Sequence, residues 1–154
     1  MTKERAQELL EDIRPTSLRL KQVNYLLSLP DDTESLRAVS YGEKVATYTT
    51  GDNTANTVIR KIDKRKDLEV ERDELRTKLE LYMEWLSGLS EIYQELASDI
   101  YIDGHSYYWI AQERSCEIST LYVRRARMLE SLAETEIFVL TEPERRKRNE
   151  RSDQ

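Results

Sequence analysis

The stretch that decides the fold is YIDGHSYYWIAQERSCEISTLYVRRARMLESL, residues 101–132. The pair Asp103-Gly104 indicates a turn, because glycine adopts the left-handed backbone conformations that tight turns require. Ser106 follows at the position where a hydroxyl can cap the start of a helix. This part therefore predicts a turn followed by a short helix over residues 106–114.

A second helix is predicted to begin between residues 117 and 119 and to end near Leu132. Its apolar residues recur at helical spacing and form an inner stripe of Leu121, Met128, Leu129 and Leu132. Upstream, residues 89–101 have the same periodicity and predict another helix. Helix, turn, short helix, turn and longer helix is the order of elements in a helix-turn-helix unit.

The spacing within this stretch agrees with such a unit. Tyr107, Ile110 and Ala111 are expected to face inward, and Cys116 is expected to fill an apolar position in the second turn. In a helix-turn-helix unit, the first turns of the last helix enter the major groove of DNA, and arginines further along contact phosphates. The predicted DNA-contacting residues are Ser106, Ser119, Thr120, Tyr122, Val123, Arg124, Arg125 and Arg127.

The same residues resemble a known family. The run from Tyr101 to Ala111 is similar to the entry of sigma factor region 4, which has a glycine, then a serine or threonine, then Ile-Ala at its end. The run from Leu121 to Leu132 resembles the recognition helix of that region. The chain carries Arg114, Ser115 and Glu117 where the family usually has a large apolar residue, a glycine and a hydroxyl cap, and Arg124 where an apolar residue is usual.

The wider layout resembles the RinA/ArpU-type late transcriptional regulators of phages of Gram-positive bacteria. Those small proteins have a helical N-terminal part and a C-terminal motif like sigma region 4. The stretch 51–56 followed by a long charged helix fits the middle of that family. The resemblance implies a phage-encoded activator of late genes, located in the cytoplasm of the bacterial host, that binds promoter DNA and contacts host RNA polymerase.

The N-terminal part is predicted to be two helices. Residues 2–29 carry leucines at helical spacing, and we expect Pro15 to interrupt or restart this helix. A longer, highly charged helix is predicted from about residue 53 to residue 86. Its apolar seam is thin, so it must pack against residues 2–29, against a second chain, or against both. An intramolecular hairpin and a coiled-coil dimer both fit.

The predicted fold class is therefore all-α: a long-helix hairpin or coiled coil followed by a helix-turn-helix unit. Three parts are expected: residues 1–86, with a loop at 33–53; residues 87–140, the helix-turn-helix unit; and residues 141–154, a charged disordered tail. The basic cluster Arg145-Arg146-Lys147-Arg148 in the tail is expected to be solvated.

Composition limits the function. The 154 residues carry a net charge of −6 with 35% charged residues, yet residues 114–127 hold four arginines and one glutamate. Such asymmetry indicates a basic contact face on an acidic body. The sequence has no apolar run of about 18 residues, which a transmembrane helix needs, and its charged first residues are not those of a secretory signal. A membrane partner is therefore not expected.

The sequence does not predict an enzyme. It lacks a glycine-rich phosphate loop, the GxSxG and HExxH motifs and a calcium-binding loop. His105 is the only histidine and Cys116 the only cysteine, so a zinc site within one chain is excluded. We expect neither catalytic residues, nor metal ligands, nor a cofactor.

Three functions remain. The first is a transcriptional regulator that binds double-stranded DNA as a homodimer or higher homo-oligomer, because a single unit with about three phosphate-facing arginines would bind weakly. The second is a phage assembly or packaging protein of the small-terminase type. The third is a protein that does not bind DNA and instead contacts RNA polymerase or a repressor. Only the first two predict that Arg125 and Arg127 matter.

Overall fold

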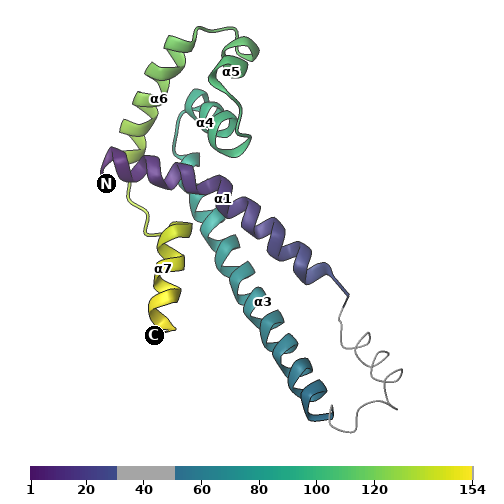
Figure 1. Cartoon of the computed structure of the whole chain (residues 1–154). Coiled ribbons are helices and arrows are strands. Elements are labelled where there is room, and N and C mark those ends of the chain that lie inside the picture. Colours follow the sequence, from purple (N-terminus) through teal and green to yellow (C-terminus); the bar gives the residue numbers. More distant parts are fainter. Residues whose placement is uncertain (31–50, 154) are drawn as a thin grey trace. The chain divides into compact units, whose positions relative to one another are not determined.

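The computed structural model describes residues 1–30 and 51–153, and every regular element among them is helical (Figure 1). The all-α fold class is thus confirmed. In chain order the elements are α1 (Lys3–Ser28), α3 (Gly51–Ser87), α4 (Glu91–Ala97), the π-helix η1 (Ser98–Ile102), α5 (Tyr107–Glu113), α6 (Ile118–Ala133) and α7 (Glu142–Ser152).

The chain divides into two compact units that do not follow the predicted boundaries at residues 86 and 140. The larger unit contains Met1–Arg19 and Leu75–Gln154, and the smaller unit contains Leu20–Glu74. Both long helices, α1 and α3, run from one unit into the other. The sequence pattern could not show this division, because it depends on which turns of α1 and α3 pack with later helices.

The smaller unit pairs the last turns of α1 with the first two thirds of α3. Val23 of α1 is buried, and the Arg65 guanidinium donates a hydrogen bond to the Leu27 carbonyl at 3.1 Å. Helix α3 begins at Gly51, so residues 51–53 of the predicted loop are helical. The rest of that loop, up to residue 50, lies outside the described residues.

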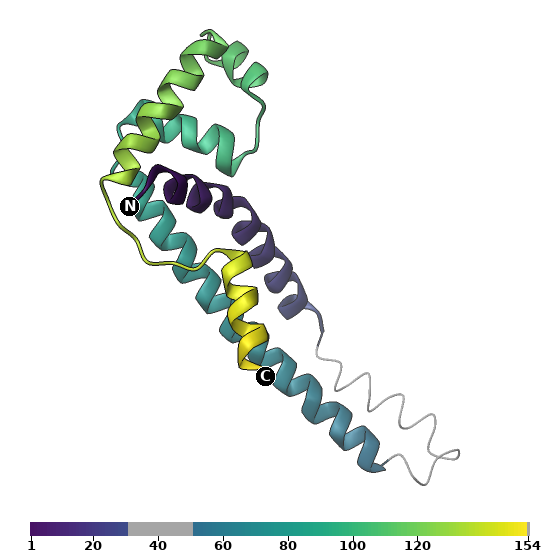
Figure 2. The same ribbon diagram turned by 60° about the vertical axis from the view of Figure 1, so that its left-hand side comes forward.

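The larger unit holds the main hydrophobic core, which joins the first half of α1 to the end of α3 and to the later helices (Figure 2). The buried residues of this core are Ala6, Leu9, Leu10, Ile13, Tyr82, Trp85, Leu86, Leu89, Ala97, Tyr101, Met128 and Leu132. Since both units pair α1 with α3 within one chain, the hairpin alternative describes this structure.

Pro15 does not interrupt α1, contrary to the prediction. Proline removes one backbone donor from the helix, but this ring lies on the exposed face, where water reaches the unpaired carbonyl one turn earlier. Its neighbours Ile13 and Thr16 are buried, and the Thr16 hydroxyl donates to the Asp12 carboxylate at 3.0 Å. Packing on both sides of the proline therefore keeps the helix continuous.

A buried polar cluster links α1, α3 and α7 within the larger unit. The Lys78 ammonium lies 2.6 Å from Asp12 and 3.3 Å from Glu142, and all three side chains are almost completely buried. The Tyr82 hydroxyl donates to Asp12 at 2.8 Å. Burial, together with this hydrogen bond, raises the pKa of Tyr82 far above its ordinary value. Each buried charge thus has an opposite charge or a donor beside it.

The prediction of a disordered tail is wrong for residues 142–152, which form α7. Thr141 and Glu144 make a capping box, and Pro143 stands in the first turn, where proline favours a helix. The Arg5 guanidinium binds both Glu144 oxygens, at 2.8 and 3.1 Å. This hydrogen bonding lowers the pKa of Glu144. The tail is ordered because its first turn is anchored to α1 and α3.

Docking of α7 also determines which side chains of the basic cluster at 145–148 are exposed. Arg145 is half-buried and binds the buried Glu142 carboxylate at 2.9 Å, so its role is structural. Arg146, Lys147 and Arg148 are exposed. Among the described residues, no helix combines the length and the hydropathy needed to cross a lipid bilayer.

Candidate nucleic-acid interface

Helices α5 and α6 form the predicted helix-turn-helix unit around a small core of their own. Its buried residues are Leu96, Ile110, Ala111 and Leu121, with Ile100, Tyr107 and Cys116 packed at the edge. The predicted inward positions are therefore confirmed. This core packs α6 against α4 and α5 and leaves the outer face of α6 exposed.

The start of α5 is capped as predicted. The Ser106 hydroxyl accepts a hydrogen bond from the Trp109 backbone N–H at 3.2 Å. The preceding turn has Gly104 at a φ of +72°. This backbone conformation favours glycine, and the Arg14 guanidinium lies against the open side of the residue, where a Cβ would require the arginine to move. Ser106 is exposed, but its hydroxyl already serves the helix.

The turn between α5 and α6 keeps its geometry without the family's usual glycine. Ser115 adopts a φ of +52°, the left-handed conformation that glycine adopts at least cost. Beside it, the Arg114 guanidinium binds both carboxylate oxygens of Asp99 in η1, at 3.1 and 3.2 Å. This pairing raises the pKa of Arg114. Arg114 thus ties the turn to η1 through charge instead of apolar contact.

The outer face of α6 brings together four of the predicted DNA-contacting residues. Ser119, Tyr122, Val123 and Arg127 are all exposed on it. The face also includes Ile118 and Ala126, which are not among the predicted DNA-contacting residues. They could have been predicted from their spacing of four residues on either side of Tyr122, because residues i and i+4 share one face of a helix.

The other predicted residues of α6 lie at its edges. Thr120, Arg124 and Arg125 are half-buried. The Arg125 guanidinium donates to the Tyr101 hydroxyl at 3.2 Å, which raises the pKa of Arg125, and that hydroxyl donates to the Gln7 side chain at 3.0 Å. Arg125 therefore connects α6 to η1 and α1, and it is less available to a ligand than Arg127.

Two contacts hold the outer side chains in place. The Tyr107 ring lies 4.8 Å from the Tyr122 ring, centroid to centroid, at an angle of 35°. Burial raises the pKa of Tyr107, in keeping with its place at the edge of the core. The Ser119 hydroxyl donates to the Glu117 carboxylate at 3.4 Å. The first turns of α6 thus present an ordered aromatic ring and an ordered hydroxyl.

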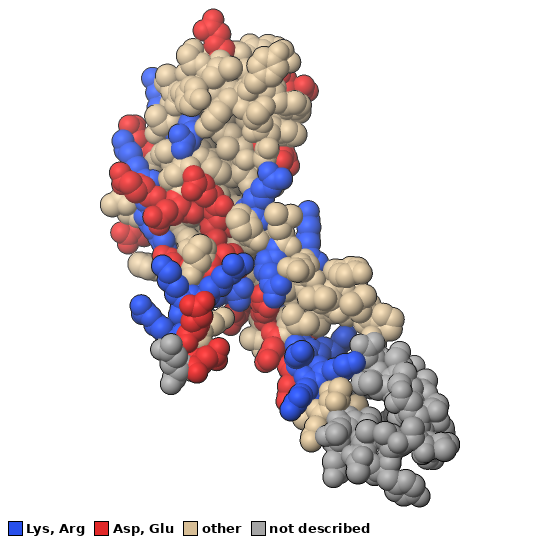
Figure 3. Space-filling model, viewed as in Figure 1, with Lys and Arg blue, Asp and Glu red and all other residues tan. Residues whose placement is uncertain are grey.

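Charge is sparse on this part of the molecule. In residues 87–133 acidic residues outnumber basic ones. In the view of Figure 3, the end of the larger unit formed by α5 and the start of α6 is largely without charged side chains. Arg124 and Arg127 are the α6 cations for which the described contacts give no role within the fold.

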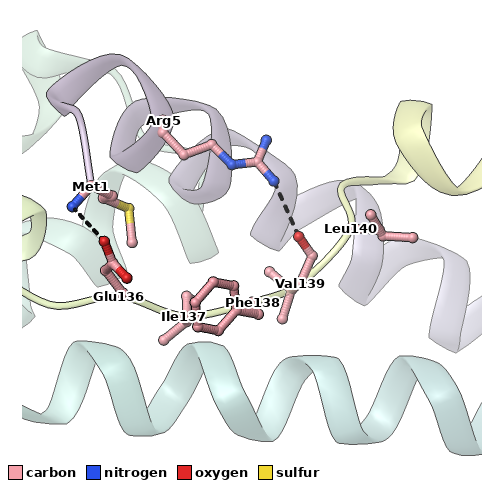
Figure 4. A pocket seen from close by; sticks show the side chains of 7 residues that line it. All are labelled: Met1, Arg5, Glu136, Ile137, Phe138, Val139 and Leu140. Atoms are coloured by element: carbon pink, nitrogen blue, oxygen red, sulfur yellow. Dashed lines mark hydrogen bonds and ion pairs between the residues drawn. The ribbon is translucent and has the colours of Figure 1, made fainter.

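A separate cavity of about 450 Å³ lies beside the segment that joins α6 to α7 (Figure 4). It is lined by Met1, Arg5 and residues 136–140. The Arg5 guanidinium donates to the Val139 carbonyl at 3.1 Å, and the Met1 amine lies 3.6 Å from Glu136. These contacts hold the segment against α1. They do not assemble a nucleophile with a base.

A metal site is not found in the part of the chain that the structure describes, where acidic, histidine and cysteine side chains nowhere gather in threes. Cys116 is half-buried at the edge of the small core, as the sequence analysis expected. The outer face of α6 is therefore the strongest candidate site. Comparison with known protein families, with curated proteins and with solved structures finds no match to this chain.

Proposed function

We propose that the chain is a DNA-binding transcriptional regulator that reads double-stranded promoter DNA with the outer face of α6. One observation carries the proposal: the first turns of α6 expose Ser119, Tyr122 and Val123, while the opposite stripe of the same helix is buried in the core of the helix-turn-helix unit. In such units these turns meet base edges in the major groove.

The sequence resemblance to RinA/ArpU-type regulators supports the biological setting. It suggests a phage protein that acts on late genes in the host cytoplasm, with host RNA polymerase as a second partner. Because Arg114 and Arg125 are engaged within the fold, one unit offers few phosphate contacts, and its affinity at physiological salt is low. The regulator is therefore expected to act as a dimer or together with polymerase.

A second candidate is supported by the chemistry of the same face. Ile118, Tyr122 and Val123 are large exposed apolar or aromatic side chains, and the core of a protein–protein interface is typically uncharged and rich in such residues. A protein that binds RNA polymerase or a repressor without binding DNA would use this surface too. The two candidates differ in whether a DNA duplex alone is bound with sequence preference.

The test is selection of binding sites from a random-sequence duplex library with the full chain, followed by titration of the selected duplex and a scrambled duplex. If the chain is such a regulator, its affinity for the selected duplex should exceed that for the scrambled duplex by a factor of about 10³ or more. Tyr122→Ala should reduce that preference. Tyr25→Ala is the matched control, because Tyr25 is an exposed tyrosine of the smaller unit (64% exposed, against 53% for Tyr122). If the folded chain enriches no sequence from the library, the proposal is contradicted, and the hypothesis of a protein that binds RNA polymerase or a repressor is favoured.

A further inference from the structure

The first two turns of α6 lack the side chains that read guanine or adenine by paired hydrogen bonds. Arginine and lysine read guanine in this way, and asparagine and glutamine read adenine. None of these four residue types occurs between Ile118 and Val123. Arg124 is half-buried at the helix edge, and Arg127 lies a full turn beyond Val123.

The exposed side chains there have a different chemistry. Ile118, Tyr122 and Val123 are 40%, 53% and 51% exposed, and they flank the small hydroxyl of Ser119. In the major groove only thymine presents a methyl group, at its C5 position, and apolar side chains recognise thymine through that methyl.

We infer that α6 reads DNA mainly through the C5-methyl groups of thymines, with Val123 and Ile118 as the apolar contacts. This inference rests on the proposed function and specifies which bases the site prefers. The Tyr107 ring packs against Tyr122, 4.8 Å from it centroid to centroid, and so supports the aromatic side chain that lies between Ile118 and Val123 on this face. Glu117 supplies the polar reader nearest the start of the helix, and a carboxylate accepts a hydrogen bond from the cytosine amino group.

The charges that border the outer face of α6 favour a DNA duplex over a lipid surface as its partner. Helix α6 carries Arg124 and Arg127 beyond the apolar turns, where phosphates follow the groove edge. An apolar helix face that lies on a membrane is typically bordered by many lysines and arginines, whereas the start of α6 is bordered by Glu117.

The experiment replaces each thymine of the selected duplex in turn by uracil, which removes the methyl group and leaves base pairing unchanged. Loss of one buried methyl contact should weaken binding about fourfold. The scrambled duplex with the same number of replacements is the control and should show no change.

A double-mutant cycle then assigns the contact to a residue. In the Val123→Ala variant, replacement of the contacted thymine by uracil should weaken binding less than about twofold, compared with about fourfold in the wild-type chain. Val70→Ala is the matched control, because Val70 is an exposed valine of the smaller unit (58%), and it should leave the fourfold effect intact.

The outcomes separate the two proposals. A selected duplex that binds tightly and is insensitive to every uracil replacement overturns the methyl readout and leaves the regulator standing. Failure to select any duplex overturns both. Sensitivity to uracil that is unchanged in both Val123→Ala and Ile118→Ala also contradicts the inference, since the methyl would then be read from another element.

Discussion

Arg125 and Arg127 are two residues apart on α6, and the structure assigns them different roles. The Arg125 guanidinium is half-buried and donates to the Tyr101 hydroxyl at 3.2 Å, whereas Arg127 is exposed on the outer face. We therefore predict that Arg125→Ala lowers the stability of the fold and that Arg127→Ala lowers affinity for DNA.

The magnitudes follow from these environments. One intramolecular hydrogen bond contributes about 1 kcal/mol, and in a chain of this length such a loss lowers Tm by about 2–4 °C. Arg125→Ala should show that shift, while Arg127→Ala should change the free energy of unfolding by no more than about 0.5 kcal/mol, as is usual for surface changes. One lost phosphate contact reduces the salt slope of log K by about 0.9. A fourfold rise in salt should thus weaken the Arg127→Ala variant about 3.5-fold less than wild type.

The assays are thermal unfolding followed by circular dichroism and titration of the selected duplex between 50 and 200 mM salt. Lys66→Ala in the smaller unit, an exposed cation far from α6 in the sequence, controls for a general change of charge. The reasoning is refuted if Arg125→Ala unfolds at the wild-type temperature and loses as much salt slope as Arg127→Ala.

Three further predictions concern the fold that supports the site. Glu142→Ala should destabilise the chain by about 2 kcal/mol, because it removes a buried charged partner of Lys78; hydrogen exchange should show lost protection across α7, and full protection there would contradict the account. Ser115→Gly should raise Tm by about 1–2 °C, because relief of the left-handed strain (φ +52°) slightly exceeds the entropy cost of glycine; a lower Tm would show that the turn is unstrained. Because Arg5 lowers the pKa of Glu144, that pair should stabilise α7 fully above pH 4.5 and lose its effect as pH falls through the folded pKa; helicity that is already lost near pH 6 would contradict this.

The helix-turn-helix unit could be predicted because its signals are local. Ser106 caps α5 through the backbone three residues later, and Leu121, Met128 and Leu132 show by spacing alone which side of α6 is buried. Hydrophobic periodicity and capping are properties of short segments, so a single sequence contains them. The prediction of α5 and α6 succeeded for that reason.

The position of α7 depends on contacts between residues far apart in the chain. Its capping box was visible in the sequence as Thr141-Glu142-Pro143-Glu144. Its docking, however, requires Lys78 and Asp12 to meet beside Glu142, and no local pattern encodes that meeting. The charge of residues 142–154 therefore suggested a solvated tail, although Glu142 is buried and Glu144 binds Arg5.

Arg125 illustrates the same limit within the candidate site. Arg125 and Arg127 look equivalent in the sequence, and only the place of Tyr101 in η1 distinguishes the two. Exposure of Ile118 and Ala126 could have been predicted from the helical period once Tyr122 was placed on the outer face.

The most direct test of the central claim is the ratio of affinities of the full chain for its selected duplex and for a scrambled duplex, measured at 150 mM salt. The account predicts a ratio of about 10³ or more, which falls in Tyr122→Ala and Val123→Ala and stays unchanged in Tyr25→Ala and Val70→Ala. Equal affinity for both duplexes, from a chain shown to be folded, would contradict the claim that the outer face of α6 reads DNA.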